Sequence, residues 1–128
     1  MDEEFMQSYY AAYNSEDATR LGAFYHEDIE LESAQGRIEG APALLQTYKT
    51  IIENFRDVMT PLSITIAKGN ADCTTVATVE ILDQFTAKVP VDDFMGQSFA
   101  QGDSFELRLT GTYQIIENKI KHVVIATR

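Results

Sequence analysis

The chain has 128 residues, of which 45% are hydrophobic, so it is long enough for one core and too short for two. Its 20 acidic and 10 basic residues give a formal net charge of -10, which would repel nucleic acid and anionic membranes. Cys73 is the only cysteine, so no intrachain disulfide can form. We therefore expect one acidic domain spanning residues 1–128 and neither of those polyanionic partners.

The start of the chain lacks the basic flank and the apolar run of a signal peptide, and no stretch approaches roughly 18 consecutive apolar residues. Together with the single cysteine, this pattern favours a reducing compartment. We expect a cytoplasmic protein.

Three helices are predicted in the first half of the chain. Apolar residues recur at spacings of three and four over residues 4–13, which predicts an amphipathic helix. A second helix is predicted over residues 16–25, with His26 at its end, where the helix dipole favours a cation. Pro42 is tolerated in a first turn and opens a third helix, whose apolar face is expected to reach Phe55.

Alternation of polar and apolar residues then predicts strands, first over residues 28–33 and, after Pro61, along most of the remaining chain. The later strands are expected at residues 62–68, 73–85, 104–116 and 120–127. Short turns at 69–70 and 117–118 join consecutive strands as in an antiparallel meander. Because helices come first and the sheet last, the fold class predicted is α+β.

Residues 86–103 interrupt the strand pattern with Pro90, Gly96 and Gly102, and they carry Phe94 and Phe99. Loops of this length are uncommon in compact domains unless they are functional or disordered. We expect this segment to act as a lid whose phenylalanines dock at the entrance of a pocket.

Several segments carry a resemblance to a known family: residues 9–14, 21–28, 38–40, 102–108 and 118–120. They resemble the opening, the approach to the long helix and the last two strands of the nuclear transport factor two-like superfamily. The branch they resemble includes the SnoaL-like polyketide cyclases and ketosteroid isomerase.

This resemblance implies a cone: a strongly curved, mainly antiparallel sheet with three helices packed on its concave face, enclosing an apolar pocket. Such a pocket suits a small, mostly hydrophobic molecule. Relatives commonly pair sheet to sheet, so a homodimer is expected through the outer face that carries Val76, Leu82 and Ile116.

The chain departs from the resemblance at both carboxylates on which these relatives rely. Ser33 stands where the isomerase has its base, and Gly111 stands where the SnoaL-like enzymes have their acid/base aspartate. Neither family mechanism transfers unchanged, because both positions lack a titratable group.

The catalytic candidates are therefore Asp83 and Tyr113. Asp83 is the lone charge on the apolar face of its strand, where desolvation would raise its pKa toward the range of a general acid or base. Tyr113 is the inward hydroxyl of the penultimate strand, suited to stabilise charge on a substrate oxygen. The alternatives are an Asp83 at the wet rim of the sheet and a Tyr113 that only packs in the core.

Aromatic residues that could contact the ligand come from the helices, the sheet and the loop. They are Tyr9, Tyr13, Tyr48, Phe55, Phe85, Phe94 and Phe99. The pattern leaves open whether His122, on the last strand, faces inward.

Two functions remain open. The first is an enzyme of the SnoaL-like or ketosteroid isomerase-like kind, transferring protons on an apolar carbonyl compound with Asp83 as base. The second is a non-catalytic module that holds a hydrophobic ligand or a protein partner. No phosphate loop, HExxH or GxSxG motif occurs, so neither reading includes a metal or an organic cofactor.

Overall fold

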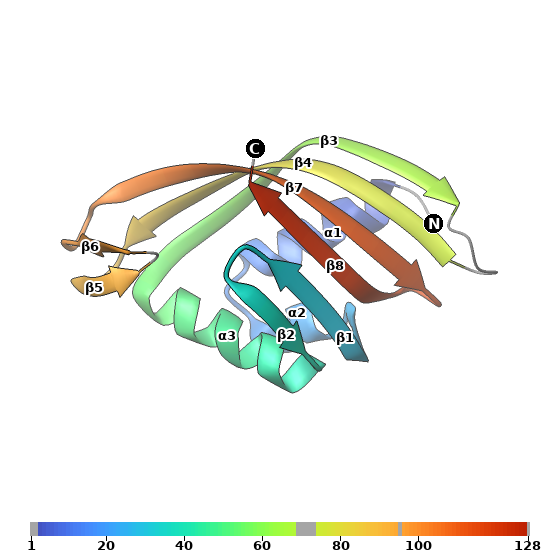
Figure 1. Ribbon diagram of the computed structural model, residues 1–128, viewed down its shortest axis with the longest axis horizontal. Helices are drawn as coiled ribbons and strands as arrows, with labels where there is room; N and C mark the ends of the chain where they lie inside the picture. Colours follow the sequence, from blue (N-terminus) through green and yellow to red (C-terminus); the bar gives the residue numbers. More distant parts are fainter. Residues whose placement is uncertain (1–2, 69–73, 95, 128) are drawn as a thin grey trace.

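The computed structural model describes residues 3–68, 74–94 and 96–127. One six-stranded sheet, in the order β2-β1-β8-β7-β4-β3, arches over the helices, which lie on its concave side (Figure 1). Only the β1–β8 pair is parallel among the strand pairs of this sheet; the other neighbours are antiparallel. The α+β class and the curved, mainly antiparallel sheet are confirmed.

The strands differ greatly in length, and the long ones build the arch. They are β1 (Tyr25–Ser33), β2 (Gly36–Glu39), β3 (Phe55–Lys68), β4 (Thr74–Ala87), β7 (Ser104–Ile116) and β8 (Lys119–Thr127). Bulges in β3 and at the start of β8 interrupt the regular register, and bulges increase local twist and bending.

The helices are α1 (Glu3–Asn14), α2 (Ala18–Gly22) and α3 (Ala41–Asn54). Helix α1 carries Glu3 and Glu4 in its first turn, where negative charge complements the helix dipole. Asp17 caps α2 by accepting hydrogen bonds from the backbone N–H groups of Thr19 and Arg20. Helix α3 has a proline in its first turn, as predicted. No helix in the described part of the chain has both the length and the hydropathy of a membrane span.

The second helix is shorter than predicted, and this changes the position of His26. Helix α2 ends at Gly22, and Tyr25 already begins β1. His26 therefore lies in a strand, where its Nδ1 accepts a hydrogen bond from the backbone N–H of Asp28 at 3.0 Å. The prediction of a cation at a helix end was wrong, because the backbone turns into the sheet three residues earlier.

The third helix also ends earlier than its apolar stripe indicates. Phe55 caps the helix in an extended conformation and is the first residue of β3, which continues through Pro61. Proline is acceptable there because β3 lies at the edge of the sheet and its register shifts between Pro61 and Ser63. The prediction of Phe55 on a helix, and of a strand that begins only after Pro61, was wrong.

The expected long loop is largely ordered. Strand β4 continues to Ala87, and β5 (Val91–Phe94) pairs with β6 (Gln97–Phe99) in a small antiparallel hairpin beyond the main sheet. This hairpin lies at one end of the arch in Figure 1. Cys73 and the predicted turn at 69–70 lie outside the described residues.

The buried residues that the structure describes form two hydrophobic clusters. The larger joins α1, α2, α3 and the concave face of the sheet, with Met6, Leu21, Ile29 and Ile120 fully buried in it. The smaller is aromatic and attaches the β5–β6 hairpin to the sheet; its rings are Phe55, Phe85, Phe94, Phe99 and Phe105. Phe85 and Phe105 stack with ring centroids 4.7 Å apart, so the hairpin rests on a packed aromatic base.

Candidate functional site

A cavity of about 480 Å³ lies between the helices and the concave face of the sheet. Its wall is mostly apolar, and α1, α3, β1, β3, β4, β7 and β8 all contribute to it. Volumes of this size accommodate small organic molecules. The polar groups in the wall therefore decide what chemistry the cavity can perform.

Two aspartates meet in this wall. Asp57 on β3 pairs with Phe85, and Met59 pairs with Asp83 on β4, so the two aspartates are diagonal neighbours on the inner face of the sheet. The two carboxyl groups are close enough for each to shift the pKa of the other. Asp57 is only 1% exposed and Asp83 only 2% exposed. A carboxyl pair that is closed off from water in this way must share a proton.

The electrostatics assign that proton to Asp83. Burial, the hydrogen bond to Asp57 and the charge of Asp57 together raise the pKa of Asp83 to about 10. Burial also raises the pKa of Asp57, but the hydrogen bonds from Asp83 and Tyr13 oppose that rise because they stabilise its ionised form. Asp57 is therefore the carboxyl group of the pair that ionises first, and Asp83 is the one that keeps its proton.

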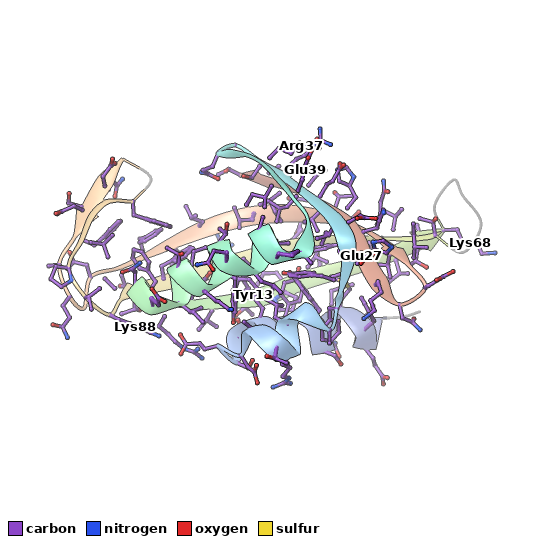
Figure 2. The ribbon with its side chains drawn as sticks, turned by 90° about the horizontal axis from the view of Figure 1, so that it is seen from below. Tyr13, Glu27, Arg37, Glu39, Lys68 and Lys88 are labelled. Atoms are coloured by element: carbon purple, nitrogen blue, oxygen red, sulfur yellow. The ribbon has the colours of Figure 1, made fainter. Side chains whose placement is uncertain are left out.

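Tyr13 completes the group. Its hydroxyl donates to Asp57 Oδ2 at 2.7 Å, and burial raises the pKa of Tyr13 so that this hydroxyl keeps its proton. The end of α1 is attached to β3 by Asn14, whose side chain makes two hydrogen bonds to the backbone of Met59 at 2.8 and 2.9 Å. Tyr13 lies in the interior between α1 and α3 (Figure 2).

Tyr113 also lines the cavity, but it lies far from the carboxyl pair along the sheet. Its partner on β4 is Ala77, six residues before Asp83, a separation of roughly 20 Å along the strand. Its hydroxyl accepts a hydrogen bond from Tyr10 at 2.8 Å. Asp83 and Tyr113 thus belong to two different polar regions of one cavity.

The other candidate ligand residues separate into two groups. Tyr9, Tyr13, Tyr48, Phe85 and Phe94 line the cavity. Tyr9 and Tyr25 face each other with hydroxyl oxygens 3.1 Å apart, and Tyr48 donates to the backbone carbonyl of Tyr13.

Phe55 and Phe99 are not among the described residues of the cavity wall. Both pack in the aromatic cluster behind it, where their ring centroids are 5.7 Å apart. They support Phe85 and Phe94, which do face the cavity.

Ser33 and Gly111, the two positions where the resemblance implies a carboxylate, have different surroundings. Ser33 lines the cavity, and its hydroxyl lies 3.2 Å from Gln35 Oε1. Gly111 leaves room for a neighbouring ring: a Cβ on residue 111 would lie 2.8 Å from Cε1 of Tyr113. A larger residue at position 111 would therefore displace Tyr113.

His122 lies on the outer face of the sheet. The register shift in β8 places Ile120 and Val123 inward, so His122 does not share a face with Ile120 as the alternation suggested. Its Nε2 lies 3.4 Å from Glu32 Oε2. It is therefore separated from the cavity by the sheet.

Asp57 was not identified from the sequence. The signal was present, since Phe55, Asp57 and Met59 alternate inward, but the apolar stripe of α3 runs directly into this segment and hides the start of β3. Within the described ranges, no group of three or more His, Cys, Asp or Glu side chains could hold a metal ion.

A curved sheet closed by three helices around one apolar cavity defines the nuclear transport factor two-like class of proteins. Residues 6–123 match the family model described as SnoaL-like domain, so the chain belongs to the SnoaL-like family. A search of the curated proteins finds no match.

Solved structures show the same fold at low sequence identity. A protein from Xanthomonas campestris, provisionally named a polyketide cyclase, is 20% identical with a TM-score of 0.75, and the match covers 98% of this chain and 89% of that one. An M. tuberculosis epoxide hydrolase is 12% identical with a TM-score of 0.71, covering 98% and 80%. A protein of ketosteroid isomerase-like fold from Catenulispora acidiphila, in complex with trimethylamine, is 12% identical with a TM-score of 0.72, covering 98% and 85%.

Proposed function

We propose that the protein is a small-molecule enzyme that transfers protons on an apolar carbonyl-type compound, or on an epoxide, bound in the cavity. The observation that carries this proposal is the Asp57–Asp83 pair in the cavity wall, with the Tyr13 hydroxyl bound to Asp57. An acid and a base side by side are the elements that enolisation, dehydration and epoxide opening require.

The charge states give each carboxyl group a role. Asp83 keeps its proton at neutral pH, because burial and the neighbouring charge raise its pKa, and it therefore serves as the acid that donates to a substrate oxygen. Asp57 is the base that removes a proton from carbon or water, with Tyr13 holding its Oδ2. This assignment gives Asp83 the acid role instead of the base role expected from the sequence.

Tyr113 has a different role in this proposal. Because it lies several residues along the sheet from the pair, it cannot contact the same substrate oxygen as Asp83. It contacts the far end of a longer ligand through its hydroxyl, whose neighbour Tyr10 already donates to it. Names such as polyketide cyclase and epoxide hydrolase among structures of the same fold are consistent with ligands of this kind.

The competing function is a binding module without chemistry. It is favoured by the two positions where the resemblance implies carboxylates, because neither carries an acid or a base. Ser33 has only a hydroxyl group, and Gly111 leaves room for the ring of Tyr113. A ligand would then bind in the cavity and leave unchanged.

Proton transfer itself can be measured without knowing the natural substrate. Small cyclic ketones in deuterated water should exchange their α-protons in the presence of the protein, as followed by NMR, and a parallel panel of epoxides should be hydrolysed. Asp57→Asn should lower the rate on any active compound by about a hundredfold or more, the usual contribution of a general base.

Asp92→Asn, which removes an exposed carboxylate on β5, is the matched control and should retain the rate. Equal rates for wild type and Asp57→Asn would remove the pair from the mechanism. Binding of these compounds with no exchange or hydrolysis by any of the proteins would favour the binding module.

A further inference from the structure

The carboxyl pair presents a negative charge without a buried cation to balance it. The described residues of the cavity wall include no lysine, arginine or histidine. The nearest basic residue along the chain is Arg56, which points away from the cavity, donates to the carbonyl oxygen of Asn14 at 2.8 Å and approaches Glu16 at 3.7 Å. The charge on Asp57 is therefore stabilised by hydrogen bonds and, from outside the cavity, by the charge of Arg56, but no described cation lies in the cavity wall beside it.

Two oxygens of the pair are also unsatisfied. Asp57 Oδ1 and Asp83 Oδ1 are buried and have no hydrogen-bond partner in the described structure. Leaving a buried acceptor unpaired is unfavourable, and more so when it belongs to a charged group. A donor supplied by a ligand would relieve this, and a positively charged donor would relieve the unbalanced charge as well.

The surroundings of the pair favour an organic cation. Phe85 and Phe94 line the cavity near the pair, and aromatic faces attract an ammonium group. The rest of the wall is mostly apolar, with leucines such as Leu44, Leu107 and Leu109. A divalent metal is disfavoured, since Mg²⁺ or Ca²⁺ takes about six or more oxygen ligands and the described residues form no such cluster.

We infer that the cavity binds an apolar molecule carrying an ammonium group, with the ammonium against Asp57 and Asp83 and the apolar body along the leucine wall. This assigns a ligand class to the site, and it does not depend on turnover, because the charge of the pair is present whether the protein is an enzyme or a binding module. The acidic surface, with its net charge of -10, would also attract such a cation from solution.

Three probes of nearly equal shape test the inference: naphthylmethylamine, naphthylmethanol and naphthoic acid, each titrated calorimetrically into the whole protein at neutral pH. None has an enolisable carbonyl group or an epoxide, so the result is independent of the proposed reaction. The amine should bind about tenfold tighter than the alcohol, or more, the usual gain of a charge-assisted hydrogen bond, and the acid should bind weakest.

Variants then locate the preference. Asp83→Asn keeps the charge on Asp57, so it should keep the preference for the amine. The double variant Asp57→Asn with Asp83→Asn removes the charge and should bind amine and alcohol equally.

Equal binding of amine and alcohol by the wild type would overturn the inference. So would an amine preference that survives in the folded double variant, since the ammonium would then bind elsewhere. If the double variant does not fold, the affinities of the wild type for the three probes still test the inference. Naphthoic acid that binds as tightly as the amine would contradict an anionic site.

Discussion

The ring of Tyr113 lies across Gly111, so that a Cβ on residue 111 would be 2.8 Å from Tyr113 Cε1 and 3.0 Å from its hydroxyl oxygen. Tyr113 is 1% exposed, and Tyr9 and Tyr10 pack edge-on against its ring. The ring therefore has little room to move. The absence of a side chain at position 111 is a packing requirement of this tyrosine-rich core.

Gly111→Ala should therefore destabilise the protein. Overpacking a buried site usually lowers the free energy of unfolding by about 1–3 kcal/mol. Urea unfolding of the single variants Gly111→Ala and Tyr113→Ala and of the double variant checks the cause. The alanine at position 111 should have little further effect once the ring is removed, and equal losses with and without the ring would show that the clash is not responsible.

The shared proton of the carboxyl pair predicts how stability depends on pH. The pKa of Asp83 rises from 3.8 to about 10 on folding, so the folded state binds a proton more tightly than the unfolded state between these values. Stability is then highest below the unfolded pKa and falls as pH rises toward the folded one. This carboxyl group alone contributes a slope of at most about 1.4 kcal/mol per pH unit.

Asp83→Asn should remove this slope, because an amide can donate to Asp57 without titrating. Urea unfolding at about pH 5, 7 and 9 should show the variant gaining stability relative to wild type as pH rises. Asp92→Asn controls for the loss of one negative charge at an exposed position. A constant difference between Asp83→Asn and wild type across the range would mean that Asp83 is already ionised in the folded protein.

The fold could be predicted because its signals are local and consistent. Apolar spacing marks α1 and the start of α3, and period-two alternation marks β4 and β7 along nearly their whole length. The order of helices before strands then leaves few arrangements other than α+β.

The site was only half predicted, for a physical reason. Asp83 stands out as a charge on an apolar strand face, but its partner Asp57 lies on β3 three residues after α3 ends at Asn54, where helical and strand patterns overlap. Their proximity comes from the β3–β4 register, which no local pattern of either strand specifies. The position of His122 depends in the same way on a bulge in β8.

The β5–β6 hairpin is predicted to act as a lid. Phe94 lines the cavity and also packs on Phe55 with ring centroids 4.6 Å apart, so it couples the hairpin to whatever occupies the cavity. A bound naphthalene probe should slow amide hydrogen exchange in the hairpin, and Phe94→Ala should speed dissociation of the probe. The outer residues of β7 provide the internal reference for the exchange rates. Amide hydrogen exchange in the hairpin that stays the same with every bound probe would contradict a lid.

The outer face of the sheet is predicted to pair two copies of the chain. Val124 is 37% exposed on this face, and Val76, Leu82 and Ile116 are half-buried there among threonines and charged residues. No helix of the described structure covers this face, because all three lie on the concave side (Figure 1). A second copy would bury these side chains and the threonines between them.

Light scattering at micromolar concentration should therefore give about twice the chain mass of 14.4 kDa. Val124→Asp should shift the protein toward the monomer, because two such carboxylates would be brought into the apolar interface. Val89→Asp is the matched control, since Val89 is 41% exposed but lies between β4 and β5, away from the outer face. A wild-type mass equal to that of one chain would refute the pairing, and an equal shift in both variants would show that added charge, and not the sheet face, separates the copies.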